Sequence, residues 1–378
     1  MTIVFVVDNY SCTSNGTIIS TLRFKNELER QGHIVRVVSN DTYGPNTYCL
    51  KTRRIPIVSS FAKRCNMTFA KFNKRVVADA IKDADVVHLL LPFYVQTKTL
   101  KLARKMGINV TAAFHLHPDN VLKNGGLKNP PPTMTKWVFE RWRKILYDKV
   151  DDIHCPSQLI ADELVKHNYT ARLHVISNGI SEEFQHIERV RPNVCLANPF
   201  RILMVGRFAC EKRQDLLIDA VAMSKYADVI ELTFAGSGPL EKKLCEQAKC
   251  LPNYPIFKFM LQKELHMVIK KSDIYVHCAD VEVEGISCIE AFATGLVPVI
   301  GDSSLSATKQ FAIMPESLFT AGDAGSLKER IEFWIENPKK LQTASLEYSE
   351  FAKGFTIKES AKKLVEMFEQ SRLTFEKK

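Results

Sequence analysis

The sequence predicts an α/β protein of two domains, each built around a doubly wound parallel sheet. Short apolar runs of the kind found in buried parallel strands alternate with helical stretches in both halves of the chain. A length of 378 residues exceeds one ordinary core and suits two domains. The segment 188–199, rich in Pro and Asn, predicts a linker, and the domains are expected at 1–187 and 188–356.

The first half begins with a strand, a helix and a second strand. The apolar run Thr2–Asp8 predicts the first strand, a helix is expected over 18–31, and strand 33–39 follows. Asn15 and Gly16 lie in the polar loop before the helix, where such a pair ordinarily forms a turn. The remaining elements expected in this half are strands 85–91, 109–114, 152–156 and 173–176, and helices 96–106 and 157–167.

Strand 109–114 leads directly into the motif FHLHPDN. Ligands of doubly wound sheets gather at the carboxyl ends of the strands, so His115 is a candidate functional residue, with His117 close by. For one histidine taken alone, a structural hydrogen bond is the alternative. Asp83 and Asp85 have the D-x-D spacing of a metal-binding pair. They precede strand 85–91, however, and are therefore expected at the wrong end of the sheet.

The second half repeats the alternation of strand and helix. The expected strands are 201–205, 231–238, 256–260, 273–277 and 297–301, and the expected helices are 240–249, 286–294, a polar stretch from 319 to 334, and 357–375. A Gly-Ser-Gly-Pro turn ends strand 231–238. Because Glu241 stands where a dinucleotide fingerprint would need its last glycine, a dinucleotide site there is only weakly indicated.

The stretch His277–Asp302 has the features of an anion site. Gly285 precedes helix 286–294 at a point where the backbone must pass close to a ligand, and Ile286 and Ser287 open the helix with free N–H groups. Glu282 and Glu290 frame the site. A carboxylate accepts hydrogen bonds from neighbouring hydroxyls, so the pair suits a sugar and a ribose on either side of a diphosphate. Taken singly, these carboxylates are more often solvated surface charges.

A second charged motif, GRFACEK, follows strand 201–205. Gly206 lets the chain turn at the end of the strand, and Arg207 and Lys212 would together neutralise a diphosphate through charge-assisted hydrogen bonds. A basic loop without function is the alternative.

Together, these motifs resemble those of a known enzyme family. Glu282, Gly285 and Glu290 fall at the positions of the E-x7-E signature of the family 4 retaining glycosyltransferases, and GRFACEK resembles their G-R-x-x-x-E-K donor motif. The resemblance spans nearly the whole chain. It implies the GT-B fold, in which two Rossmann-like domains face a cleft and the C-terminal helix, here 357–378, crosses back to the first domain.

The resemblance also assigns expected roles. The Asn15-Gly16 loop resembles the glycine loop that faces the donor phosphates, His115 matches a donor-contacting histidine near the reacting carbon, and the Leu261 backbone would lie near the donor base. The expected catalytic residues are His115, Arg207, Lys212 and Glu282. The expected donor-binding residues are Asn15, Gly16, Gly206, Leu261, Gly285, Ile286, Ser287 and Glu290. No protein-bound metal is expected, because Arg207, Lys212 and the helix N-terminus would stabilise the departing diphosphate. The nucleotide-sugar, UDP-glucose or a related UDP-sugar, is expected as a co-substrate, and no other cofactor is expected.

The charge distribution bears on the acceptor. The net charge is +10, and residues 1–190 hold 27 Lys and Arg against 17 Asp and Glu, so the excess belongs to the first half. Two stretches, 59–77 and 130–150, combine cations with aromatic residues, which suits the headgroup layer of an anionic membrane. Solvated helix faces with inward aromatics, or nucleic-acid binding, are alternatives. No nucleic-acid module is recognisable, and no nucleic-acid partner is expected.

The expected activity is front-face transfer of a hexose to a membrane lipid or a cell-envelope glycan. FHLHPDN and the Gln310-Phe311 segment look most like bacterial enzymes that glucosylate diacylglycerol. The rivals are an epimerase of the same fold, whose proton-abstracting carboxylates have no match here, and an inactive donor-binding partner protein, which would lose Arg207, Lys212 or Glu282.

The expected location is cytoplasmic, peripheral on the inner face of the cell membrane. No apolar run approaches eighteen residues, and the N-terminus enters a strand without a leader. The ten cysteines form no C-x-x-C pair and no zinc spacing, and several lie in apolar runs. Reduced core thiols are therefore expected.

Overall fold

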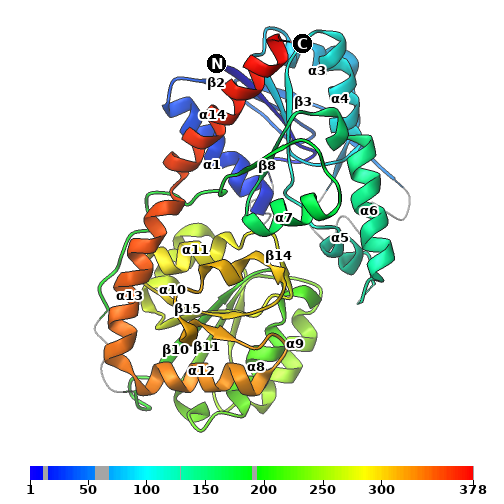
Figure 1. The fold of residues 1–378 in the computed structure, drawn as a ribbon. Coiled ribbons are helices and arrows are strands. Elements are labelled where there is room, and N and C mark those ends of the chain that lie inside the picture. The colour runs from blue at the N-terminus through cyan, green and yellow to red at the C-terminus, as the bar shows by residue number, and fades with distance from the viewer. Residues whose placement is uncertain (12–15, 56–67, 128, 190–193, 378) are drawn as a thin grey trace. The chain divides into compact units, whose positions relative to one another are not determined.

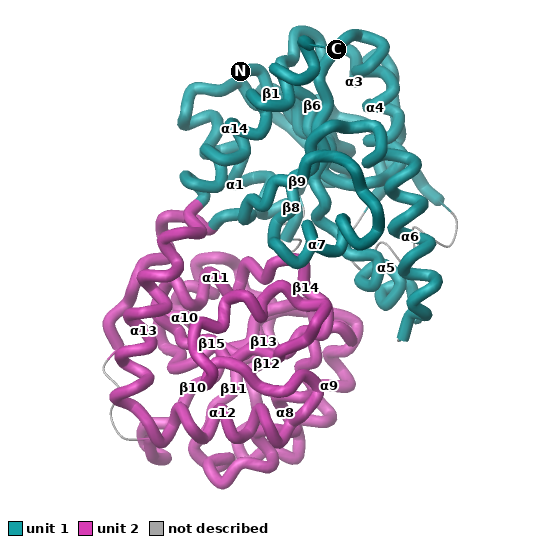
Figure 2. The backbone as a smooth tube through the Cα atoms, in the orientation of Figure 1, with its two compact units in different colours: residues 1–179, 357–378 teal, residues 180–356 magenta. Residues whose placement is uncertain are grey.

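A computed structural model describes residues 1–11, 16–55, 68–127, 129–189 and 194–377 (Figure 1). The chain divides into two compact units (Figure 2). Unit 1 comprises Met1–Gly179 and Ile357–Lys378, and unit 2 comprises Ile180–Thr356. The division expected from the sequence, at 187 and 188, lies slightly further along the chain.

Within the described part of unit 1, seven strands form a sheet in the order β3-β2-β1-β6-β7-β8-β9, with every neighbouring pair parallel. The order reverses direction at β1 and β6. The strands are β1 (Thr2–Val6), β2 (Ile34–Ser39), β3 (Thr47–Cys49), β6 (Val86–Leu89), β7 (Val110–Ala113), β8 (Asp152–Cys155) and β9 (Arg172–Val175). The helices are α1 (Gly16–Arg30), α3 (Lys74–Ile81), α4 (Tyr94–Lys105), α5 (Pro118–Asn124), α6 (Pro132–Ile145), α7 (Gln158–Lys166) and α14 (Ile357–Glu376).

Unit 2 repeats this topology over its described residues. Its main sheet has six strands in the order β12-β11-β10-β13-β15-β17, again all parallel, and the order reverses at β10 and β13. The strands are β10 (Phe200–Val205), β11 (Ile230–Ala235), β12 (Ile256–Lys258), β13 (Ile274–His277), β15 (Val297–Gly301) and β17 (Leu318–Phe319), and a short separate pair is formed by β14 (Val281–Glu282) and β16 (Leu305–Ser306). The main helices are α8 (Gln214–Ala222), α9 (Glu241–Gln247), α10 (Gln262–Lys271), α11 (Ile286–Ala293), α12 (Ala324–Glu336) and α13 (Pro338–Ala352).

The strands form where the sequence places continuous apolar runs, because both faces of each parallel sheet are covered. Strands β6, β13 and β15 are buried at every position. Local capping sets several helix starts: Ser157 accepts from the Ile160 N–H at α7, and Asp323 accepts from two N–H groups at α12. The fold class expected from the sequence is therefore confirmed. Helices α5, α8, α10 and α13 and the edge strands β3 and β17 were not predicted, and the helix expected from 319 begins at Ala324.

The C-terminal helix α14 packs in unit 1 and docks on the amino ends of its strands. Asp85 accepts hydrogen bonds from the Thr2 N–H (2.6 Å) and from the Arg372 guanidinium (3.4 Å), and Ser371 donates to the Asn109 side chain (3.2 Å). The D-x-D pair thus lies at the amino end of β6, as the sequence indicates, and Asp85 has a structural role there.

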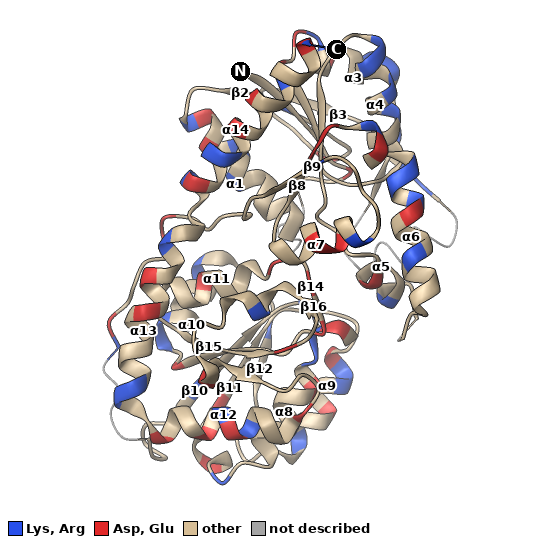
Figure 3. Ribbon diagram, viewed as in Figure 1, with Lys and Arg blue, Asp and Glu red and all other residues tan. Residues whose placement is uncertain are grey.

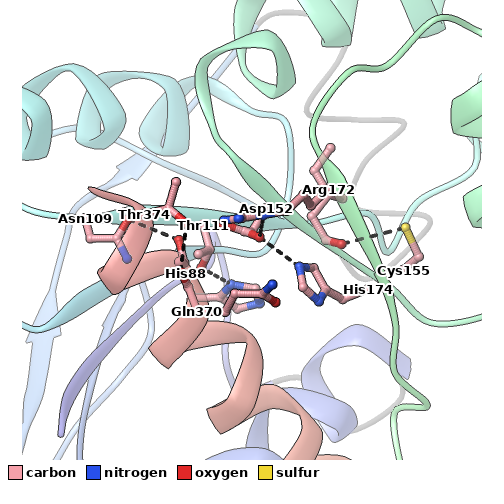
Figure 4. Close-up of polar contacts among 11 residues, drawn as sticks. His88, Asn109, Thr111, Asp152, Cys155, Arg172, His174, Gln370 and Thr374 are labelled. Carbon is pink, nitrogen blue, oxygen red and sulfur yellow. Dashed lines mark hydrogen bonds and ion pairs between the residues drawn. The ribbon is translucent and has the colours of Figure 1, made fainter. Parts of the chain in front are cut away.

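A buried carboxylate lies in the same region. Asp152 accepts two hydrogen bonds from Arg172 (2.8 and 2.9 Å) and one from His174 (2.8 Å). Figure 4 shows His174 pointing to Asp152, and His88 beside Thr111. Burial opposes the charge on Asp152, but its hydrogen bonds to His174 and Arg172 outweigh burial and lower its pKa to about 2. The polar residues in this region therefore stabilise the amino edge of the sheet.

Candidate active site

The candidate site of unit 2 lies where the strand order reverses. Arg207 follows the carboxyl end of β10, and the loop carrying Glu282 follows the carboxyl end of the neighbouring strand β13. Neighbouring strands whose connections leave in opposite directions open a crevice at this edge of the sheet. The two motifs found in the sequence therefore converge on the place where doubly wound sheets bind ligands.

Arg207 is held by an acidic residue of its own motif. Its Nη2 lies 2.6 Å from Oε1 of Glu211, and Gln214 donates to the Arg207 carbonyl (3.0 Å). Burial raises the pKa of Glu211, but Arg207 and then Lys212 outweigh burial and lower it. Glu211 is therefore ionised and fixes the guanidinium of Arg207. The sequence analysis included Glu211 in the motif without assigning it a role.

The Gly-Ser-Gly-Pro turn after β11 supports the Gly206-Arg207 turn. A Cβ at Gly236 would lie 2.0 Å from the Gly206 carbonyl oxygen, and one at Gly238 would lie 2.4 Å from the Phe208 carbonyl oxygen. The Phe208 N–H donates to the Ser237 carbonyl (2.9 Å). These glycines are required because two backbone segments touch here, which explains a glycine pattern that does not match a dinucleotide fingerprint.

Lys212 and Glu282 form an ion pair between the two motifs. The methylene groups of Lys212 pass over Gly206, within 4 Å of where a Cβ would stand. Arg213 follows in the left-handed region (φ 56°, ψ 43°), an unfavourable conformation for a non-glycine residue, and its side chain contacts Asp215 (3.2 Å) and Asp280 (3.6 Å). Asp215 and Asp280 thus stabilise the left-handed turn at Arg213, and this turn determines the direction in which the preceding residue, Lys212, points.

Glu282 is largely buried, with 16% of its side chain exposed. Burial opposes its charge, but Lys212 and then His277 outweigh burial and hold the pKa of Glu282 well below its usual range. Glu284 and Glu290 are also buried. The alternative that these carboxylates are solvated surface charges is therefore wrong.

Gly285 precedes α11 in the left-handed region (φ 89°), and a Cβ there would lie 2.3 Å from Cγ2 of Thr308. Glycine is required on both counts. Among the described residues, no side chain caps α11, and its first turn, which contains Ile286 and Ser287, holds no acidic residue. The N–H groups at this end of the helix carry partial positive charge that no acidic side chain of the first turn offsets.

Two further residues connect the loop to the helix. Nε2 of His277 lies 3.6 Å from Glu282 Oε2, and Nδ1 of His277 lies 3.2 Å from the Tyr275 hydroxyl. That hydroxyl lies 3.0 Å from Oγ of Ser287. The sequence predicted Tyr275 as part of a strand and His277 as the first residue of the anion-site stretch, without a role for either side chain. Tyr275 and His277 are alternate residues at the carboxyl end of that strand and therefore lie on the same face of it. Two polar side chains in this position are the pattern from which their role could have been predicted.

In unit 1, His115 follows β7 and is 9% exposed. Its ring packs edge-on against His154, with centroids 5.0 Å apart. Burial and then His154 lower the pKa of His115 well below 6.5, so the imidazole is neutral near pH 7. His117 caps α5 by accepting from the Asp119 N–H (3.2 Å), which gives it a structural role.

The remaining predicted residues are less constrained. Gly16 is the first residue of α1, while Asn15 lies outside the described residues. Leu261 precedes α10 after β12 and is 67% exposed. Among the residues that the structure describes, no group of three or more His, Cys, Asp or Glu side chains could hold a metal ion. The eight cysteines within the described ranges are all free.

The comparisons with known proteins agree with this geometry. A family profile described as "Glycosyltransferase Family 4" matches residues 14–184, and one described as "Glycosyl transferases group 1" matches residues 188–349. The chain belongs to the GT-B glycosyltransferases. It is a hexosyltransferase with two parallel-sheet, Rossmann-like domains.

Individual relatives extend the comparison. An α-monoglucosyldiacylglycerol synthase from Streptococcus pneumoniae is 27% identical over 318 residues, which is 79% of this chain and 70% of that protein. The solved structure of sucrose-phosphate synthase from Thermosynechococcus elongatus has a TM-score of 0.78 at 15% identity and covers 99% of both chains. HepE from Anabaena, in complex with UDP-glucose, has a TM-score of 0.71 at 15% identity and covers 100% of both chains.

Proposed function

We propose that this glycosyltransferase moves glucose from UDP-glucose to the hydroxyl of a diacylglycerol-type membrane lipid, with retention at the anomeric carbon. The observation that carries the proposal is the Lys212–Glu282 ion pair, which joins the end of β10 to the loop before α11. It brings a cation and a sugar-binding carboxylate to the edge of the sheet where the open end of a helix attracts an anion. The UDP-glucose complex of HepE supports the choice of donor.

The reaction follows from these groups. The donor diphosphate would bind at the N-terminus of α11, with Lys212 and Arg207 meeting its charge as the bond to the anomeric carbon breaks. In a front-face transfer, the acceptor oxygen bonds to that carbon on the side from which the diphosphate leaves, and the acceptor proton passes to a departing phosphate oxygen. Glu282 would accept hydrogen bonds from the sugar hydroxyls. The role of His115 in donor contact stays a prediction.

Helix α6 supports a membrane-borne acceptor. Phe139 and Trp142 are buried, while Trp137 is 62% exposed, and Lys136, Arg141 and Lys144 of the same helix are exposed as well. Figure 3 shows basic segments along α6 with an acidic segment between them. A helix face that exposes a tryptophan among cations fits binding to an anionic headgroup layer better than it fits an ordinary solvated surface. The printed name of the Streptococcus relative points to a glycolipid product. No helix among the described residues is long and apolar enough to cross a membrane.

The structure narrows the residues that this surface would use. Arg143 donates to the carbonyls of His167 (3.2 Å) and Asn168 (3.0 Å) and lies 3.5 Å from Asp148, so it is a structural residue. The exposed residues of α6 are Pro132, Thr133, Met134, Lys136, Trp137, Arg141 and Lys144, and Glu140 is half-buried. Of stretch 59–77, residues 59–67 lie outside the described residues, and Lys71, Lys74 and Arg75 are exposed.

The proposal is tested by incubating the protein with labelled UDP-glucose and vesicles that contain diacylglycerol. The vesicles are made with and without anionic lipid, and cholesterol or a polyprenyl phosphate replaces diacylglycerol in separate arms. Lipid-linked, α-configured glucose that depends on diacylglycerol supports the proposal. Product only with another lipid would refute diacylglycerol as the acceptor. A β-linked product would refute retention, and release of a free epimer would refute the transfer itself.

The membrane surface is tested separately. The triple variant Lys136→Gln, Arg141→Gln, Lys144→Gln should weaken sedimentation with anionic vesicles, since each cation near such a surface contributes about 1 kcal/mol. Trp137→Ala should weaken it further, whereas UDP binding should be unchanged. As a matched control, the exposed Lys358, Lys362 and Lys363 of α14 are replaced in the same way. Equal loss in both triple variants would indicate a diffuse charge effect and not a docking face.

A further inference from the structure

We propose that His277 is a positioning residue of unit 2 that serves as the second hydrogen-bond donor to Glu282, with its tautomer fixed by Tyr275. This inference rests on the proposed function, because it concerns how Glu282 is kept ready for the donor sugar. It names two residues, on the strand before the E-x7-E signature, that the signature does not include.

The geometry places Glu282 between two nitrogen donors. Oε2 of Glu282 contacts Nζ of Lys212 and lies 3.6 Å from Nε2 of His277. His277 is 2% exposed, and its Nε2 is a buried atom with no hydrogen-bond partner. A buried nitrogen left unpaired beside a carboxylate is costly, and a small movement of Glu282 would pair it.

The neighbours determine where the proton on His277 lies. Burial, the largest influence, lowers the pKa of His277, so the ring is neutral and carries one N–H. Glu282 is ionised and can only accept, which puts the proton on Nε2. Nδ1 then accepts from the Tyr275 hydroxyl at 3.2 Å, and the Tyr275 oxygen accepts from Ser287 at 3.0 Å. Donation therefore runs in one direction, from Ser287 through Tyr275 and His277 to Glu282.

This arrangement matters because two anions, Glu282 and the donor diphosphate, compete for the ammonium of Lys212. With no donor bound, Lys212 neutralises Glu282. A bound diphosphate would attract the ammonium of Lys212 and leave Glu282 buried without its partner, which is strongly unfavourable. The Nε2–H of His277 is then the group that can close on Glu282, keep it ionised and hold its second oxygen toward the sugar hydroxyls. Lys212 is thereby free to bind phosphate without the loss of the sugar-binding carboxylate.

The first test uses four variants assayed for UDP binding and for UDP-glucose turnover. His277→Ala should lower kcat/KM about 10- to 100-fold, as expected for the loss of a hydrogen bond to a charged group. UDP affinity should also fall in His277→Ala, because Lys212 cannot then turn to the diphosphate without leaving the buried Glu282 unpaired. His277→Gln should recover most of the activity, since its Nε2 can donate to Glu282 as the imidazole does. Tyr275→Phe should fall between the two.

Tyr226→Phe is the matched control. It removes one tyrosine hydroxyl elsewhere in unit 2, where that hydroxyl donates to Glu336 (3.1 Å), and should leave turnover unchanged. Wild-type turnover by His277→Ala would overturn the inference. So would equal losses of turnover and of UDP affinity in His277→Ala and His277→Gln, because a merely structural residue would not be rescued by a side chain that keeps the N–H donor.

A second measurement needs no turnover and separates this inference from the proposed function. Nitrogen-15 NMR of imidazole-labelled protein, assigned with His277→Gln, should show His277 neutral and protonated at Nε2. A proton on Nδ1 would overturn the inference whatever the enzyme transfers. A wild-type protein that shows the Nε2 proton but does not turn over UDP-glucose would instead refute the proposed function and leave the hydrogen-bond chain standing.

Discussion

The two units share one topology but differ in the chemistry at the carboxyl ends of their strands. Unit 2 carries the ion pairs Arg207–Glu211 and Lys212–Glu282 beside the N-terminus of α11. At the corresponding edge, unit 1 presents the neutral, buried His115. The paired charges of unit 1 at Asp85 and Asp152 lie at the amino ends of its strands, where Asp85 docks α14. The topology thus fixes where a ligand can bind, and the side chains decide which ligand.

The largest expected effect tests the ion pairs of unit 2. Lys212→Ala should lower turnover about 100-fold or more, because it removes a preorganised charge from the departing diphosphate. It also leaves Glu282 buried without its cation. The measurement is kcat with UDP-glucose at saturating acceptor. Lys225→Ala, which removes the exposed pair with Glu336 in the same unit, is the control and should leave kcat unchanged. Near-normal activity of Lys212→Ala would refute its assigned role.

The next effect tests the turn before α11. Gly285→Ala forces a side chain into the left-handed region, at a cost of about 1–2 kcal/mol. Its Cβ also collides with Cγ2 of Thr308. UDP affinity, measured by calorimetry, should fall because the helix N-terminus is displaced. Thr308→Ser removes Cγ2, so the double variant should regain the part of the loss caused by the collision. If the double variant regains no UDP affinity, the strained backbone at position 285 alone causes the loss.

A smaller effect is expected in unit 1 at Asp8, which is buried after β1. Burial raises the pKa of Asp8 to about 6, although the Ala70 N–H (2.9 Å) and Gln96 (2.8 Å) donate to it. Because the folded pKa exceeds the unfolded one, folding stability is lost as the pH rises from about 4 to about 6. Asp8→Asn should therefore stabilise the protein by about 3 kcal/mol at pH 8 and by little near pH 4.

The amide of Gln96 makes that substitution feasible. Its Oε1 is buried without a partner, so a rotated amide can accept from the new Asn side chain. Urea unfolding at pH 4 and pH 8 measures the difference, with Asp79→Asn on the surface of α3 as the control. If Asp8→Asn destabilises the protein to the same extent at both pH values, the charge of the Asp8 carboxylate does not lower the folding stability.

The smallest expected effect is an absence of change. Because the pKa of His115 lies well below 6.5, the pH profile of kcat/KM between pH 6 and 8 should show no ionisation that belongs to this residue. His115→Gln should lower activity but leave the shape of the profile unaltered. A limb near pH 6.5 that disappears in the variant would show that His115 changes protonation during turnover, and the contrast between the two units would then be weaker.

The sequence was a good guide to the fold and to the position of the site. Buried strands such as β6, β13 and β15 appear as continuous apolar runs because both of their faces are covered. Gly285 was recognised as a position where the backbone passes close to a ligand, and the structure adds that it adopts the left-handed conformation. Helices α5, α8, α10 and α13 were missed. The boundaries of other elements shifted by a few residues, because local patterns define helix ends poorly.

The sequence by itself determined most of the strands, their order and the motifs at the strand ends, because these depend on short-range periodicity and on backbone requirements. Only the tertiary structure decided that Lys212 meets Glu282, 70 residues further along the chain. It also decided that His277 and Tyr275 connect Glu282 to Ser287, and that Trp137 points outward while Trp142 packs inward. Partners and burial depend on which strand ends the fold brings together, and no local pattern contains that information.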